Sequence, residues 1–284
     1  MQAHEIMQQS VLTATPDMSL ALAWRLMEDH RIRHLPVVVD HRLIGIVTDR
    51  DIRRASLALN TSHTPAEMTY HMGTTAIETC MTRDIVTTSP EADIRQGVQQ
   101  MLAGHVGCLP VLSHKQLVGI ITEIDLLGAY LIAAATMQRS TRVVQEAMQE
   151  LMIVVTPEDL VSTAYQRMQG GVVRHLPVLD EANKLVGVIT DRDIRLAGNF
   201  DNPELPAPSL SERFAMMTVD QIMTTQVYTV WRHTPLTEAA ELFLTHKFGC
   251  LPVIHDDATV AGILTVTDVL CLYVAMLGSE HTTT

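Results

Sequence analysis

The pattern of apolar and polar positions repeats four times along the chain. In the first copy it predicts a short strand at 11–13, a helix from 16 to about 29, strands at 35–39 and 43–47, and a helix from Thr48. Apolar residues in the first helix recur every three or four positions, and the strands are β-branched and separated by a polar turn at 40–41. The same order recurs from Ile85, Met152 and Val227. We therefore expect an α/β (α+β) fold built from four β-α-β-β-α units.

A short motif marks the same place in each copy. Leu-Pro-Val opens the pair of longer strands, and Gly-apolar-apolar-Thr-x-x-Asp closes it. Leu-Pro-Val lies at 35–37, 109–111, 176–178 and 251–253, and the closing motif at 45–51, 119–125, 187–193 and 262–268. One match would carry little weight, but four matches with the same internal spacing indicate a repeat protein.

On these residues the chain resembles the CBS domain family, named after cystathionine β-synthase. The resemblance implies that repeats pair two by two around a pseudo-twofold axis. We expect a first tandem pair at 1–137, with repeats at about 1–59 and 78–137, and a second at 143–279, with repeats at about 143–199 and 218–279. The boundary is placed in the short polar junction at 138–144. Four such repeats without another domain resemble the gamma subunit of AMP-activated kinase and prokaryotic tandem-CBS proteins.

Two long connections interrupt the pairs, at 56–79 and 198–219. Both exceed ordinary loop lengths, so we expect each to be functional or to contain structure of its own.

Composition and charge narrow the class of protein. The net charge of −12 argues against a nucleic-acid surface and against anionic lipid. No apolar run approaches the ~20 residues of a membrane span, and the first ten residues lack the pattern of a signal peptide. The four cysteines show no C-x-x-C spacing, so we expect free, buried, reduced thiols and no metal site. We expect a cytoplasmic protein that binds neither nucleic acid nor membrane.

The Thr-x-x-Asp motif admits two interpretations. It is a capping-box arrangement that would help the helix begin. It is also suited to ribose, because a carboxylate accepts hydrogen bonds from both vicinal hydroxyls. The Gly three residues before each Thr favours the second interpretation, since glycine lets a ligand approach the backbone. The resemblance implies the same role for Thr48, Asp51, Thr122, Asp125, Thr190, Asp193, Thr265 and Asp268.

The resemblance also places the adenine ring, in an apolar slot between the first strand and the segment before Leu-Pro. The matching positions are Val11, Thr13, Ile32, Ile85, Thr87, Val106, Val173, Val227, Thr229 and Phe248. The third repeat departs from the pattern, with Met152 and Val154 where the others have an aliphatic residue and Thr. Ordinary core packing is the alternative role for all of these.

Positive charge divides the repeats into two kinds, which we call odd (first and third) and even (second and fourth). The odd repeats carry Arg33, His34, Arg50 and Arg53, and Arg174, His175, Arg192 and Arg195. The even repeats have Gly-Cys before Leu-Pro, at 107–108 and 249–250, and uncharged residues around the Asp. The arginine fork suits phosphate, so we expect the odd repeats to line a phosphate path. Ion pairs with neighbouring acids such as Asp49 are the alternative.

The even repeats end in apolar helices that follow Asp125 and Asp268. Their equivalent positions suggest a shared interface between the pairs, between the subunits of a homodimer, or with a client protein. Burial within the same chain is the alternative.

No catalytic motif stands out: the chain has no G-x-S-x-G, no P-loop, no Rossmann fingerprint and no H-E-x-x-H. We therefore expect no enzyme and no catalytic cofactor, but a regulatory protein that senses an adenosine nucleotide and changes its conformation or partner contacts. AMP, ADP or ATP is the leading candidate for the ligand, because S-adenosylmethionine would not need the odd-repeat arginines. NAD and cyclic di-AMP remain open as ligands. The alternative is an oligomerisation or docking scaffold with weak or vestigial sites.

Overall fold

The computed structural model describes residues 1–59, 65–136, 142–171, 173–197 and 214–279. They form mixed α/β repeats, as the hydrophobic pattern predicts, and fall into two compact units. Among the described residues, the first unit is Met1–Leu126 and the second runs from Leu127 onward. The predicted boundary between the pairs stays a prediction, because most of 138–144 lies outside the described residues.

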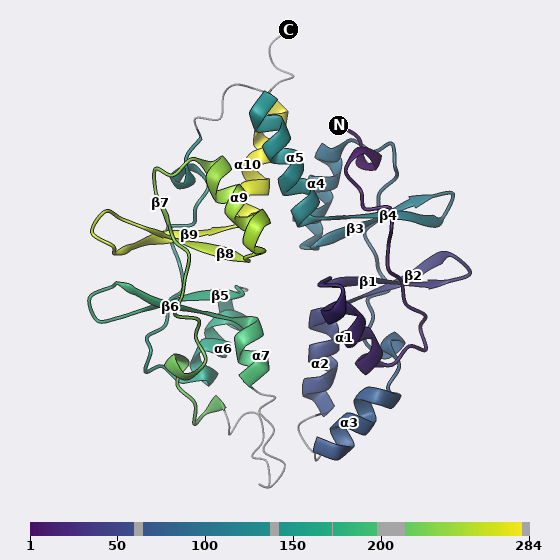
Figure 1. Cartoon of the computed structure of the whole chain (residues 1–284), viewed down its shortest axis with the longest axis horizontal. Helices are drawn as coiled ribbons and strands as arrows, with labels where there is room; N and C mark the ends of the chain where they lie inside the picture. The colour runs from purple at the N-terminus through teal and green to yellow at the C-terminus, as the bar shows by residue number, and fades with distance from the viewer. Residues whose placement is uncertain (60–64, 137–141, 172, 198–213, 280–284) are drawn as a thin grey trace. The chain divides into compact units, whose positions relative to one another are not determined.

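Each repeat contains an antiparallel hairpin (Figure 1). The hairpins are β1 (His34–Val39) with β2 (Arg42–Thr48), β3 (Cys108–Ser113) with β4 (Gln116–Thr122), β5 (His175–Leu179) with β6 (Leu185–Thr190), and β8 (Cys250–Ile254) with β9 (Val260–Thr265). The predicted turn is confirmed: Asp40 and His41 have φ of 48° and 63°, the left-handed geometry of a tight hairpin turn. In the first repeat Val37 pairs with the motif glycine Gly45, and a β-bulge follows directly. The other three hairpins have the bulge at the equivalent place.

The first strand of each predicted unit is the element that the pattern overestimates. Residues 11–13 form no strand, and the chain there makes a single parallel bridge, Ala14 with Val37. The second and third repeats have the same lone bridge, and only the fourth extends it, as β7 (Val230–Trp231) beside β8. In the first three repeats this segment pairs with the edge of the hairpin at one point only, before the chain continues toward its helix. The apolar run therefore does not form a strand there.

Polar side chains cap the beginning of several helices, such as α1 (Leu20–Asp29), α2 (Asp49–Leu59) and α4 (Ile94–Gly104), whereas α9 (Leu236–His246) follows Pro235 without a side-chain cap. The prediction that the first helix begins at Pro16 is wrong: α1 begins after Ser19, whose Oγ accepts the Leu22 N–H at 3.3 Å. The helix predicted from Thr48 is α2, directly after that threonine. The helices equivalent to α1 are α4, α6 (Val161–Gly171) and α9, and those equivalent to α2 are α5 (Glu123–Thr136), α7 (Asp191–Ala197) and α10 (Val266–Ser279). Within the described residues, no helix is both long and apolar enough to cross a membrane.

The first long connection contains a helix, as predicted. Helix α3 (Pro65–Thr74) lies in it and packs against α1 and α2. Most of the second connection, at 198–219, falls outside the described residues.

Within each pair the two repeats exchange their first residues, a feature that the sequence pattern does not reveal. We call residues 3–8, 77–82, 144–149 and 219–224 the exchange segments. Each begins with a short 3-10 helix: η1 (Ala3–Glu5), η2 (Ile77–Thr79), η3 (Val144–Glu146) or η4 (Val219–Gln221). Backbone hydrogen bonds tie each segment to the other repeat of its pair, for example Ala3 N to Ala92 O and Ile77 N to Met18 O.

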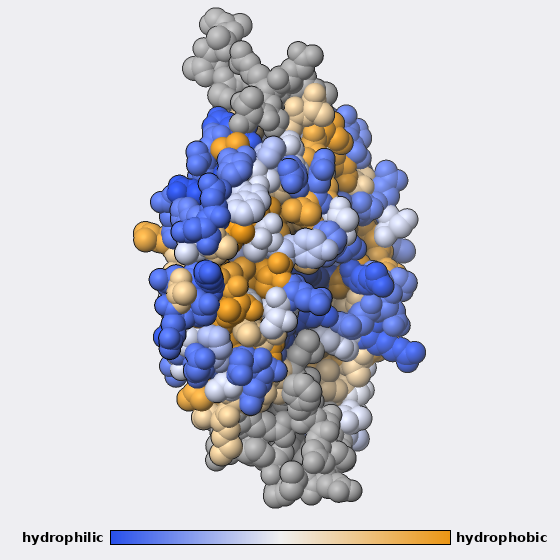
Figure 2. Space-filling model, turned by 60° about the vertical axis from the view of Figure 1, so that its left-hand side comes forward, coloured by the Kyte–Doolittle hydropathy of each residue, from blue (hydrophilic) through white to orange (hydrophobic). Residues whose placement is uncertain are grey.

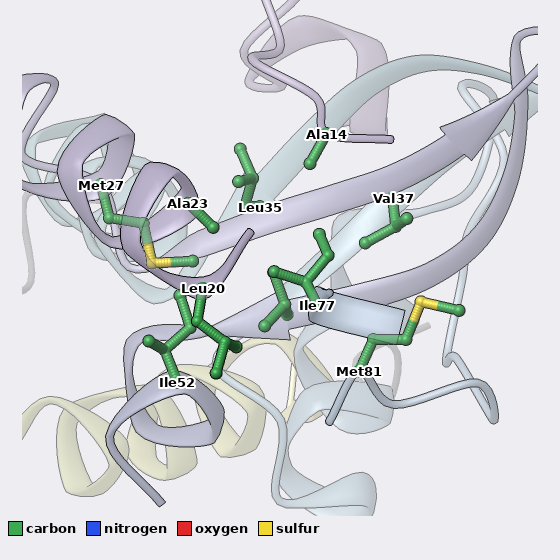
Figure 3. Close-up of a cluster of buried hydrophobic side chains, with 10 residues drawn as sticks. Ala14, Leu20, Ala23, Met27, Leu35, Val37, Ile52, Ile77 and Met81 are labelled. Atoms are coloured by element: carbon green, nitrogen blue, oxygen red, sulfur yellow. The ribbon is translucent and has the colours of Figure 1, made fainter. Parts of the chain in front are cut away.

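The exchange completes the hydrophobic cores. The core of the first repeat consists of α1, α2 and hairpin side chains together with Ile77 and Met81, which come from the second repeat (Figure 3). Val219 completes the core of the third repeat in the same way. Because a repeat without its partner leaves part of its core open to water, the pair is the smallest unit that buries its apolar surface.

Candidate functional site

The Thr-x-x-Asp motif forms the same side-chain cap in all four repeats. The Thr backbone N–H donates to Asp Oδ2 at 2.8 to 2.9 Å, and the Thr hydroxyl donates to the same oxygen at 2.6 to 2.7 Å. In three repeats the Thr hydroxyl also accepts the Asp N–H, at 3.2 Å in the two odd repeats. The capping interpretation therefore describes Thr48, Asp51, Thr122, Asp125, Thr190, Asp193, Thr265 and Asp268 in this structure. It uses only one oxygen of each carboxylate.

The other oxygen, Oδ1, distinguishes the odd repeats from the even ones. In the even repeats it accepts a side-chain amide from the exchange segment of the paired repeat: Gln8 Nε2 to Asp125 at 2.9 Å and Gln149 Nε2 to Asp268 at 2.8 Å. The exchange segments that lie against the odd repeats carry Thr82 and Thr224 at that position. Among the described side chains, none donates to Oδ1 of Asp51 or of Asp193.

Close packing explains why the motif positions are glycine, a reason that the sequence interpretation missed. A Cβ on Gly119 would lie 2.5 Å from Met7 Sδ, and one on Gly187 would lie 2.7 Å from Met223 Sδ. Gly45 meets Met81 in the same way, and Gly262 meets the backbone of Gln149. Because an exchange segment fills the space beside each glycine, the glycines by themselves are no evidence of a ligand.

The predicted adenine positions of the first pair meet where the two repeats join. Val11 and Ile85, from different repeats, pack on one cluster of buried residues, Ile46, Cys108 and Ile120. Ile46 and Ile120 lie two residues before the capping threonines, so this apolar cluster adjoins both motifs. Ile32 instead packs on the core of its own repeat. Thr13 is exposed, and Thr87 and Val106 are half-buried.

In the second pair, Val227 and Thr229 line a pocket of about 230 Å³ together with Gly187 and Ile254. Phe248 is not among its lining residues and stacks on His246, with ring centroids 5.0 Å apart. Val173 is 36% exposed. The structure thus brings some of the predicted adenine residues together and leaves others apart.

The predicted phosphate residues have different surroundings. Arg53 forms an ion pair with Asp49 of its own helix, lies 5.4 Å from the Trp24 ring and is nearly buried, so the ion-pair alternative describes it here. Arg33, Arg174 and Arg192 are exposed, and Arg50 is half-buried. The side chain of Arg195 lies outside what the structure describes.

His34 and His175 pack against the glycines of the even repeats. A Cβ on Gly107 would lie 2.9 Å from His34 Nε2, and Gly249 faces His175 in the same way. The Arg-His and Gly-Cys sequences at equivalent positions are therefore complementary: the imidazole of the odd repeat occupies the space that the even repeat leaves. The sequence contained this signal, but only the pairing shows that the two positions face each other.

A second pocket, of about 400 Å³, lies beside Asp51. Leu20, Ala55, Thr79 and Cys80 line it, as do Arg54 from α2 and Thr75 from the long connection. Arg54 is not among the residues that the sequence pattern predicts for the site. In this pocket a guanidinium and a carboxylate lie next to residues of the connection that was expected to be functional.

The cysteines are free. The expectation that all are buried is confirmed for Cys108 but wrong for the others, since Cys80 and Cys250 are half-buried and Cys271 is exposed. Burial, with a smaller effect of Glu123, raises the pKa of Cys108 to about 12, and burial raises the pKa of Cys250 to about 12. Burial, followed by Asp51, raises the pKa of Cys80 to about 11. At neutral pH these thiols are protonated and poor nucleophiles.

The apolar helices bury aromatic side chains against each other. In the second unit Tyr130 and Tyr273 are fully buried and meet edge to face, with ring centroids 5.6 Å apart. Burial within the chain, one of the alternatives, therefore accounts for these two side chains. Ile132 of α5 is 57% exposed. Figure 2 shows one face of the molecule, on which apolar residues lie among hydrophilic ones.

The repeated motif, the four hairpins and their pairing agree with the result of a family comparison. The model of the CBS domain matches residues 3–58, 77–132, 144–198 and 219–274. The chain belongs to the CBS domain family. Its four domains form two tandem pairs.

Relatives cover more than nine tenths of the chain. MJ1225 of Methanocaldococcus jannaschii, an uncharacterized protein, is 27% identical over 271 residues, which are 92% of this chain and 95% of MJ1225. Its crystal structure, described as that of a candidate archaeal homologue of γ-AMPK, covers 96% of this chain and all of MJ1225 with a TM-score of 0.78 and 25% identity. An uncharacterized conserved protein from Pyrococcus horikoshii shares the fold, at 20% identity and a TM-score of 0.66, over 96% of this chain and all of that protein.

Part of the chain also resembles an enzyme. Inosine-5'-monophosphate dehydrogenase of Korarchaeum cryptofilum is 32% identical over 124 residues, 43% of this chain but 23% of the enzyme. The match is confined to CBS domains, so it does not bring the dehydrogenase activity to this chain.

Proposed function

We propose that this protein is a non-catalytic regulator that binds an adenine nucleotide, AMP, ADP or ATP, between the paired repeats. Binding would favour one arrangement of the repeats and so change what the protein contacts. The observation that carries the proposal is the cap at Asp51 and Asp193, which holds each carboxylate in place by one oxygen and leaves the other available.

Ribose recognition follows from counting hydrogen bonds. A carboxylate has about four lone-pair sites, and the Thr N–H and hydroxyl use two of them on Oδ2. Two remain on Oδ1, which matches the two vicinal hydroxyls of a ribose. The cap and the ribose role are therefore compatible, since each uses a different oxygen.

The adenine ring would lie on the apolar cluster at the junction of the repeats, beside Val11 and Ile85 in the first pair and Val227 in the second. Phosphate groups would reach the odd-repeat arginines. Arg50 and Arg192 directly precede and follow acids at the start of α2 and α7, while Arg33 and Arg174 are exposed beside the histidines. Arg53 contributes less to this proposal, because Asp49 and Trp24 hold it.

The similarity to MJ1225 supports this function, because that protein is described as a candidate homologue of γ-AMPK and matches this chain over all four domains. A homodimer and an unknown client protein belong to the same proposal. The exposed Ile132 on α5 is the kind of residue that such a contact would use.

Thermal shift of the purified, nucleotide-stripped chain tests the proposal. The ligands are AMP, ADP, ATP, NAD, cyclic di-AMP and S-adenosylmethionine, each over a range of concentrations. A ligand that binds only the folded state raises the melting temperature by mass action. We expect a concentration-dependent rise with at least one adenine nucleotide. No rise with any of them would favour the scaffold alternative.

A further inference from the structure

The glutamines of the exchange segments separate the four Thr-x-x-Asp sites into two kinds. Gln8 and Gln149 occupy equivalent positions in the first and third repeats, and each reaches the carboxylate of the repeat that follows. The arrangement recurs in both pairs with nearly the same distance, although the two pairs are separate compact units. It is therefore a feature of the pair and not of one local loop.

The backbone around each site is the same, so the difference lies in the side chains. Gln8 makes two backbone hydrogen bonds with Ile120, and Gln149 makes two with Ile263. Thr82 makes the same two with Ile46, and Thr224 makes them with Val188. All four exchange segments thus pass their strand in the same register. A glutamine amide at this point reaches the Asp of the neighbouring repeat, whereas threonine is too short by two carbon atoms.

We propose that Gln8 and Gln149 close the even sites by occupying Asp125 and Asp268, so that ligand binds at the odd sites, Asp51 and Asp193. This inference rests on the proposed function and specifies which of its sites are used. In an even site the amide takes one of the two lone-pair sites that remain on the carboxylate, so ribose can make one hydrogen bond where it makes two in an odd site. A hydrogen bond to a charged group corresponds to about 10- to 100-fold in affinity, and the even sites are weaker by that factor.

The distribution of charge points to the same division. Arg50 and Arg192 lie next to the open carboxylates of the odd repeats, whereas Ile124 and Thr267 lie at the equivalent positions of the even repeats. The repeats with an available ribose acceptor are thus the repeats with cations for phosphate. The amide and the arginines are separate residues on separate segments, so the two observations are independent.

The test exchanges the two side chains. In the variant Gln8→Thr with Gln149→Thr, the even sites receive the residue that the odd sites have. In the variant Thr82→Gln with Thr224→Gln, the odd sites receive the glutamine. All four positions are exposed, and each new residue already occurs at the equivalent position, so both variants retain the register of the exchange segments. Gln9→Thr, at the exposed neighbour of Gln8, is the matched control.

AMP, ADP and ATP are titrated separately into each nucleotide-stripped full-length protein by isothermal calorimetry, and circular dichroism checks the fold. We expect wild type and the control to bind at two sites per chain, the first variant to gain the even sites at about 10- to 100-fold higher affinity than before, and the second to lose the odd sites by a similar factor. Four equivalent sites in wild type, or weaker binding in the first variant because the amide itself holds the ligand, would overturn the inference while leaving the proposed function intact. No binding of any of the three nucleotides to any of the proteins would overturn both.

Discussion

The odd and even repeats share a motif, a hairpin register and a cap, yet they differ in what lies opposite. In an even repeat the neighbour supplies Gln8 or Gln149 to the Asp and an imidazole to the glycine before Cys. In an odd repeat the neighbour supplies a short threonine. The chemistry of a repeated motif is therefore set by the residues that the paired repeat places against it. Four copies of Thr-x-x-Asp are thus not four equal sites.

Each repeat depends on its neighbour to complete its core, and removing this contact should have the largest effect on stability. Ile77 belongs to the second repeat but is fully buried in the core of the first. Ile77→Ala removes buried methyl groups and leaves a cavity, so we expect a loss of about 2–5 kcal/mol in the free energy of unfolding, measured by urea denaturation. Glu78→Ala, at the exposed next residue, is the control and should change it by less than about 0.5 kcal/mol. Equal effects of the two changes would mean that the contact made by Ile77 contributes nothing to the stability of the first repeat.

The carboxylates separate the odd sites from the even ones. In Asp51→Asn with Asp193→Asn, the amide oxygen can still accept both hydrogen bonds from Thr, but an NH₂ group replaces Oδ1. We expect nucleotide affinity to fall about 10- to 100-fold in calorimetry, because a hydrogen bond to a charged group is lost.

The matched control for this change is Asp125→Asn with Asp268→Asn, in the even repeats. We expect it to leave the wild-type affinity nearly unchanged, since Gln8 and Gln149 already occupy those carboxylates. A larger loss in the even variant than in the odd one would reverse the assignment of the sites.

The odd-repeat arginines should discriminate between ligands. Arg50→Ala with Arg192→Ala should weaken the binding of ATP by about tenfold and the binding of adenosine far less, because adenosine has no phosphate for a guanidinium to contact. Competition calorimetry with the two ligands measures the ratio. Arg25→Ala, which removes an exposed arginine paired with Asp29, serves as the control. Equal losses for both ligands would show that Arg50 and Arg192 do not contact phosphate.

The smallest effect concerns the cysteines of the even repeats. The pKa of Cys108 and of Cys250 is raised to about 12, so at pH 8 the thiolate fraction of each is about 10⁻⁴. A raised thiol pKa delays ionisation, and their alkylation by iodoacetamide should stay slow until the pH rises well above 9. The exposed Cys271 should react first, as peptide mass spectrometry can determine. Alkylation of Cys108 before Cys271 at pH 8 would contradict the burial described here.

Local patterns predicted the hairpins and capped helices well, and their errors have identifiable causes. The Asp-His turn and the helix after Thr48 depend on residues close in sequence, so the sequence was sufficient for both. Residues 11–13 resemble a strand in sequence, but only Val11 packs on the junction between the repeats, and only the following residue, Ala14, pairs with the hairpin. The beginning of the first helix was misjudged because Ser19, and not Pro16, caps it.

The motif glycines illustrate how a correct pattern received an incomplete reason. Their fixed place three residues before Thr is visible in the sequence and suggested an approaching ligand. In the structure, methionine side chains or backbone atoms of the exchange segments occupy that space. A residue that lies 36 positions away in the chain, as Met81 does from Gly45, cannot be recognised as its neighbour from spacing alone.

Residue identity and short-range spacing were enough to predict the number of repeats, the hairpin and cap of each repeat, and the division of positive charge between odd and even copies. Only the folded pair shows which repeat completes which core, why the glycines are required, and which carboxylates keep an oxygen to which no described side chain donates. These depend on contacts between segments tens of residues apart, and those contacts exist only once the two repeats of a pair have folded against each other.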